Sequence, residues 1–202
     1  SNGTLWLTPS IAGGAYTQTT TANLDEFNAE GIDLSATYMI GLGNAGFLPI
    51  TMQGTYALAN TLTTPLVSYD CIGYFGYQCG QSQPDWQHRM RATWETNFNM
   101  NFSLQWRYFG GVTNDDGSSD PDLADPEGQE FWAINGIDQI GAQNWFDIAM
   151  SWMITDGIRF NVGVNNVLDE EPPLAPDHND NNLYETYDPL GRYVFSSLQF
   201  SF

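Results

Sequence analysis

Apolar and polar residues alternate along unusually long segments of this chain, and no other feature restricts its fold as strongly. Residues 100–108 read MNFSLQWRY, in which every even-numbered position is apolar or aromatic and every odd-numbered position is polar. Because successive side chains of a β-strand point to opposite faces, this segment predicts a strand with one apolar and one polar face.

The same period of two recurs along the whole chain and predicts eight antiparallel strands. The alternation is weakest in the first of them. Their expected ranges are 4–16, 23–40, 47–58, 86–98, 100–110, 144–155, 157–168 and 191–202.

A soluble β-sandwich also alternates, but its strands usually span five or six residues, whereas these reach ten or more. Trp and Tyr lie towards the segment ends, as in the aromatic girdles of membrane barrels. Four of the five arginines fall on the polar face of a strand, where a wet interior keeps them hydrated. They are Arg89, Arg91, Arg107 and Arg159.

Short and long connections between the predicted strands alternate strictly. Short turns are expected at 41–46, near residue 99 and at Asp156-Gly157, which is a two-residue hairpin signal. Outer-membrane barrels combine short periplasmic turns with long outside loops in this way. The long polar loops are expected at 59–85, 111–143 and 169–190.

The charge composition agrees with this placement. The chain has 24 acidic and 5 basic residues, a net charge of −19, and the acidic residues concentrate in the long loops. Such a balance excludes sequence-independent nucleic-acid binding, which needs a basic footprint. The sequence contains no run of 18 apolar residues, so no transmembrane helix is predicted. The 14% aromatic content argues against disorder.

Cys71 and Cys79 lie close together in a Gly- and Tyr-rich loop, which favours a local disulfide formed in an oxidising compartment. A ring this short stabilises by somewhat less than about 3 kcal/mol in the chain-entropy model. The alternatives are free thiols or a zinc site, and for zinc only His88 lies near in sequence as a further ligand.

Three other motifs have simpler interpretations. Residues 41–46, GLGNAG, match a dinucleotide fingerprint, but an alternating segment with Pro49 follows where the mechanism needs a helix. Asp177 and Asp188 have a partly EF-hand-like spacing, yet Asn182 stands at the glycine position, so they are weak calcium candidates. His178 lies in a loop, and no serine and acidic residue are spaced around it in a way that indicates a catalytic triad. We therefore expect no enzymatic activity, and we expect no cofactor.

The arginines on the polar face are the most informative polar residues. A turn centred near residue 99 places Arg107 directly opposite Arg91, with Glu95 further along the same strand. This cluster either contacts an anionic substrate or acidic partner, or pairs structurally with Glu95, Asp33 or another domain.

Two C-terminal segments, NVGVNNVLDEEPP at 161–173 and YDPLGRYVFSSLQFSF at 187–202, resemble the end of a TonB-dependent outer-membrane receptor. The segments 26–38 and 71–94 are also similar to parts of these barrels. The matching positions of the last-strand motif are Tyr187, Asp188, Gly191, Arg192 and the terminal Phe202.

The resemblance implies that residues 1–202 form the last eight strands of a 22-stranded transmembrane barrel. It also implies active import of a scarce small-molecule or glycan nutrient across the bacterial outer membrane. The expected partners are membrane lipid, the barrel-assembly machinery, and TonB acting through a plug domain that this sequence does not contain. A self-standing eight-stranded barrel, acting as an adhesin or structural protein, and a passive porin-like channel are the alternatives.

Overall fold

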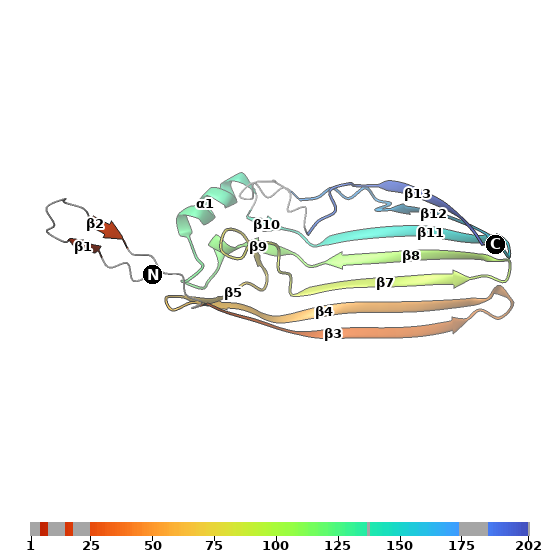
Figure 1. The fold of residues 1–202 in the computed structure, drawn as a ribbon, viewed down its shortest axis with the longest axis horizontal. Helices are drawn as coiled ribbons and strands as arrows, with labels where there is room; N and C mark the ends of the chain where they lie inside the picture. Colours follow the sequence, from red (N-terminus) through yellow and green to blue (C-terminus); the bar gives the residue numbers. More distant parts are fainter. Residues whose placement is uncertain (1–4, 8–14, 18–24, 137, 174–185, 202) are drawn as a thin grey trace.

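The computed structural model describes residues 5–7, 15–17, 25–136, 138–173 and 186–201. Its main body is one curved antiparallel sheet in the order β13-β12-β11-β8-β7-β4-β3. The seven long strands lie side by side, with tight turns at one end and larger loops at the other (Figure 1). They are β3 (Glu26–Gly41), β4 (Phe47–Thr63), β7 (Trp86–Glu95), β8 (Met100–Phe109), β11 (Gln143–Thr155), β12 (Ile158–Asn165) and β13 (Tyr193–Phe200).

The predicted antiparallel all-β architecture is confirmed, and seven of the eight predicted strands correspond to these long strands. The predicted strand 4–16 is wrong. The chain there forms two short strands, β1 (Leu5–Leu7) and β2 (Ala15–Thr17), which pair with each other and not with the main sheet. Pro9 and the adjacent Gly13 and Gly14 interrupt the weak alternation of this segment.

Two of the tight turns form where the sequence predicts them. A 3-10 turn, η1 (Gly43–Ala45), joins β3 to β4, and Asp156-Gly157 joins β11 to β12. Gly46 needs its glycine, because it adopts φ +101° and an added Cβ would lie 2.0 Å from the Glu95 carbonyl oxygen.

The long loops carry secondary structure of their own. Asp125 caps α1 by accepting a hydrogen bond from the Glu127 amide, and Gly136 ends it in the left-handed conformation. Three loop strands make a second small sheet in the order β10-β9-β6, and β5 pairs antiparallel with the end of β4. The loop elements are β5 (Ser68–Asp70), β6 (Tyr74–Phe75), β9 (Val112–Asn114), η2 (Asp115–Gly117), α1 (Pro126–Asn135) and β10 (Gln139–Ile140).

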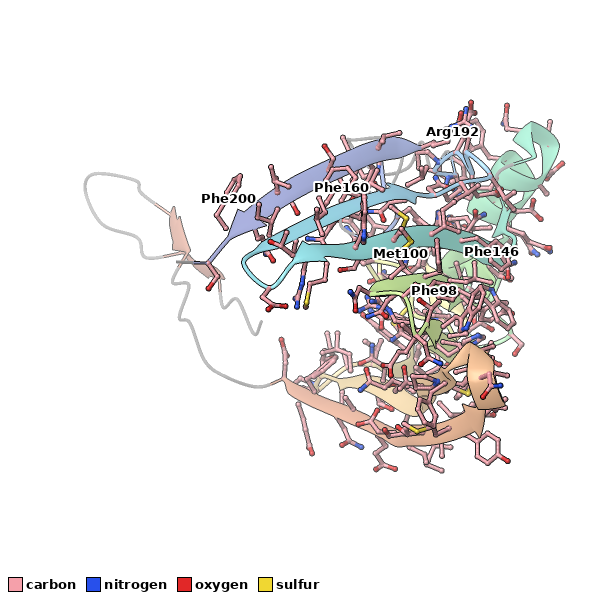
Figure 2. All side chains as sticks on the ribbon, turned by 90° about the vertical axis from the view of Figure 1, so that its right-hand side faces the viewer. Phe98, Met100, Phe146, Phe160, Arg192 and Phe200 are labelled. Carbon is pink, nitrogen blue, oxygen red and sulfur yellow. A yellow bond between two sulfur atoms is a disulfide. The ribbon has the colours of Figure 1, made fainter. Side chains whose placement is uncertain are left out.

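The main sheet has an apolar face, formed by even-numbered positions, that lies open. Figure 2 shows the sheet as an arc, with Phe200 on its outer side. The cross-strand register places the other members on the same side. Exposed apolar side chains on this face include Ile32, Leu34, Leu58, Leu104, Ile148, Val194, Leu198 and Phe200.

The buried core lies between the loops and one end of the sheet. Phe75, Val112, Ile140, Trp145 and Tyr187 form one cluster, against which Phe109 packs. A second cluster contains Tyr69, Cys71 and Leu123. Trp145 and Phe109 belong to odd-numbered positions, so the loops cover the inner, polar face at that end. Among the described residues, no helix is long and apolar enough to cross a membrane.

Candidate functional site

The candidate site is the inner face of the arc, which we call the polar face and which consists of the odd-numbered positions of the long strands. Side chains of five neighbouring strands line a cavity of about 480 Å³ on this face. Its lining includes Asp33, Gln53, Gln87, Arg89, Arg107 and Trp145.

Asp147 is the centre of the hydrogen-bond network on the polar face. Arg107 donates from Nε to its Oδ2 at 2.9 Å and from Nη2 to its Oδ1 at 3.0 Å. Gln105 Nε2 donates to Oδ2 at 2.9 Å, and the Asn166 amide donates to Oδ1 at 2.9 Å. The Arg107 guanidinium also lies 5.4 Å from the centre of the Trp145 ring. Bidentate charge-assisted bonds of this kind fix both partners strongly.

The predicted register between β7 and β8 is wrong by two residues. Arg107 faces Arg89, not Arg91, whereas Arg91 faces Gln105 and donates two hydrogen bonds to its Oε1 at 2.7 and 3.2 Å. The turn is centred one residue earlier than predicted, because the last strand pair is Glu95 with Asn101.

Two of the partners predicted for the arginines, Glu95 and Asp33, are also wrong within the described residues. Neither Glu95 nor Asp33 pairs with an arginine, and Asp33 instead accepts a hydrogen bond from the Thr55 hydroxyl at 2.7 Å. Arg159 lies on the same face but at the tight-turn end of the sheet, beside Gln199. Asp147, which sequence reasoning missed, holds Arg107.

The predicted disulfide between Cys71 and Cys79 is present, which rules out free thiols and the zinc alternative. The fully buried Asp115 secures the stapled loop, because its Oδ2 accepts the backbone N–H groups of Gln78 at 2.7 Å and Cys79 at 2.8 Å. Gly76, at φ +142°, lets the loop approach this carboxylate, since an added Cβ would meet the Asp115 side chain at 2.1 Å.

Tyr187, from the last-strand motif, joins this loop to the sheet. Its ring is 1% exposed, packs against Phe109 and Trp145, and its hydroxyl donates to Ser82 Oγ at 3.2 Å. Burial raises the pKa of the Tyr187 phenol, and the hydrogen bond to Ser82 opposes this only in part. The tyrosine therefore acts as a neutral packing group.

The remaining motif residues organise the start of β13. Arg192 donates from its backbone N–H to Asp169 Oδ1 at 2.8 Å, and its guanidinium contacts Asp169 Oδ2 at 3.4 Å. Gly191 adopts φ +63° just before this contact. The two segments that carry the family resemblance thus bind each other. Phe202 lies outside the described residues.

The calcium prediction gains no support in the described chain. Asp188 accepts a hydrogen bond from the Leu190 amide at 3.0 Å, within a local turn. Asp177 and His178 lie outside the described residues. No group of three or more His, Cys, Asp or Glu side chains suited to a metal occurs in the described ranges.

His88 lies on the apolar face, as its even position predicts. Trp86 Nε1 donates to its Nδ1 at 2.9 Å, and its ring packs against Trp106 and Tyr108. These four rings gather near the loop end of β7 and β8, where a girdle of aromatic side chains is expected in a membrane barrel.

Comparison with known proteins adds support for the fold. No family model and no curated protein sequence matches the chain. Its structure is similar to the ferric enterobactin receptor PfeA of Pseudomonas aeruginosa, with a TM-score of 0.55 and 15% identity over 86% of this chain and 22% of that one. It is also similar to the siderophore receptor PirA of Acinetobacter baumannii, with a TM-score of 0.53 and 14% identity over 96% of this chain and 25% of that one.

The chain thus spans between 22% and 25% of the length of these receptors. At this level of identity, the likeness concerns the fold. Its long antiparallel strands have the fold of part of these receptors, as the resemblance to TonB-dependent receptors predicts.

Proposed function

We propose that this chain supplies part of the barrel wall and outside loops of a TonB-dependent transporter in the bacterial outer membrane. The observation that carries the proposal is the contrast between the two faces of one sheet. The outer face leaves side chains such as Leu104 and Ile148 open, and a soluble domain would bury them. The inner face holds arginines in hydrogen-bonded contacts that suit a wet interior.

The form of the sheet supports a piece of a large barrel over a small closed one. Among the described residues, β3 and β13 are the two ends of the strand order and do not pair with each other. Open strand edges do not occur in lipid, so both edges need neighbouring strands. A 22-stranded barrel provides such neighbours, whereas a self-standing adhesin or structural barrel needs closure within this sheet.

The proposed activity is import of a scarce nutrient. The solved receptors with this fold include one that binds enterobactin, which supports a siderophore as the first substrate to test, ahead of a vitamin, haem or a glycan. The proposed partners are membrane lipid, the barrel-assembly machinery, and TonB acting through a plug domain.

Two measurements test this proposal in the source bacterium. The intact polypeptide extracted from outer membranes should have a mass several times the 22.5 kDa of this chain. Uptake of radiolabelled nutrients is measured next, first with ferric enterobactin and then with the other nutrient classes in turn. Uptake of the true substrate should fall when either this gene or TonB is removed. A mass near 22.5 kDa, or uptake of every class independent of TonB, would overturn the proposal.

A further inference from the structure

Arg89 lies beside two cavities on the polar face, and its positive charge has no counter-charge among the described residues. Its guanidinium makes no hydrogen bond or ion pair with any other residue that the structure describes. Its cross-strand neighbour on β8 is Arg107, and its cross-strand neighbour on β4 is Gln53. Asp147 neutralises Arg107, but it holds that guanidinium by both oxygens and is fully engaged.

Two cavities meet at Arg89. The 480 Å³ cavity extends from it towards Arg107 and the loop-covered Trp145. A second cavity, of about 320 Å³, extends towards Arg91 and the tight-turn end of the sheet. Arg89 and Gln53 line both, so the unbalanced guanidinium lies at the junction of two open spaces large enough for a small ligand.

The local charge is opposite to that of the chain. The whole sequence carries a net charge of −19. The two cavities, in contrast, are lined by three arginines and by one carboxylate, that of Asp33, which the Thr55 hydroxyl already contacts. Even with Asp147 added behind Arg107, positive charge is in excess. A positive patch inside an otherwise acidic molecule attracts an anion and orients it.

We propose that Arg89 is the centre of an anion-binding subsite on the polar face, for a ligand group with several anionic oxygens. The guanidinium offers a planar fork of N–H donors for such a group. Gln53 and Arg91 flank it and complete the rim, while Arg107 adds long-range attraction without leaving Asp147. The subsite rests on the proposed function, within which it contacts an anionic substrate on its way through the barrel.

The probe is pyrophosphate, titrated by calorimetry at low ionic strength into the full natural protein purified from outer membranes. Arg89→Gln should weaken binding about tenfold or more, the effect of losing a hydrogen-bonded charge. The affinity of Arg89→Lys should lie between those of the natural protein and Arg89→Gln, because lysine keeps the charge but loses the planar fork of donors. Arg159→Gln is the matched control, since Arg159 lies on the same face without an ion pair among the described residues, and should change affinity less than twofold.

Three results would overturn the subsite. They are no pyrophosphate binding to the natural protein, equal binding by Arg89→Gln, and a lowered unfolding temperature of Arg89→Gln with unchanged affinity. The last would mean that Arg89 pairs with an acidic side chain elsewhere in the protein. Pyrophosphate binding is measured without TonB and without uptake, so the two proposals can fail separately. Binding that depends on Arg89, in a protein that imports nothing, would refute only the proposed function. TonB-dependent import without Arg89-dependent binding would refute only the subsite.

Discussion

Replacing Leu104 by arginine tests which face of the sheet meets lipid. Leu104 is 49% exposed on the apolar face of β8, and its cross-strand neighbours are Ala92 and Ile148. Ser103, the preceding residue, points to the polar face between the small neighbours Thr93 and Ala149. The pair of variants Leu104→Arg and Ser103→Arg therefore places the same charge on opposite faces, one residue apart.

The size of the effect follows from the depth of Leu104. The strand β8 has 10 residues, which at a rise of about 3.4 Å and a tilt of about 35–45° span about 24–28 Å of membrane thickness. Leu104 lies at the middle of that span, where an arginine facing lipid costs about 2–4 kcal/mol. This corresponds to about a 30- to 900-fold change in the ratio of folded to unfolded protein. Ser103→Arg should cost under about 1 kcal/mol, since its side chain stays in water.

The assay is urea unfolding of the full natural protein in lipid vesicles, followed by tryptophan fluorescence, with the amount that reaches the outer membrane measured in cells. Leu104→Arg should lower both the free energy of unfolding and the amount in the membrane, and Ser103→Arg should leave both near their natural values. Equal losses, or a larger loss for Ser103→Arg, would refute the assignment of the two faces.

Three further predictions concern the polar face and its cover. Asp147→Asn should lower the free energy of unfolding by about 1.5–3 kcal/mol, because Arg107 loses its anionic partner; an unchanged urea midpoint would contradict this. Replacing Cys71 and Cys79 by serine should speed hydrogen exchange in the stapled loop, at a cost below about 3 kcal/mol, while exchange in the long strands stays the same. The raised pKa of Tyr187 means that the folded state keeps a proton that the unfolded state loses, so its contribution to stability falls as the pH rises above about 10. Tyr187→Phe should remove that part of the alkaline loss, and identical pH profiles would show that the phenol is not the titrating group.

The long strands were predictable because alternation is a property of each segment alone. The seven long strands follow a period of two, with register shifts only in the β3–β4 and β11–β12 pairs, and the tight turns between paired strands carry Gly, Asn or Asp. The hydrophobic effect needs only apolar side chains on one face, so no partner must be known to read the pattern. The first 24 residues lack this pattern, and there the prediction failed.

The folded loops were only partly visible in the sequence. The Asp125-Pro126 start and the Asn135-Gly136 end of α1 are ordinary helix signals, although they lie within the segment 111–143 that is predicted as a loop. The contact of Tyr187 with Phe109 and Trp145 joins segments far apart in the chain. No local pattern reports such a contact, so the role of the last-strand motif in closing the loop core became clear only from the structure.

The polar face is harder to predict than the apolar face for a physical reason. Any apolar side chain satisfies a position that faces lipid, so the pattern tolerates errors in alignment between strands. Each polar position instead needs a particular partner, as Arg107 needs Asp147 on β11. Moving the centre of one turn by a single residue shifts the opposite strand by two positions, which here replaces Arg91 by Arg89 as the neighbour of Arg107. That shift, together with the Asp147 contact to Arg107, is why the proposed anion subsite centres on Arg89.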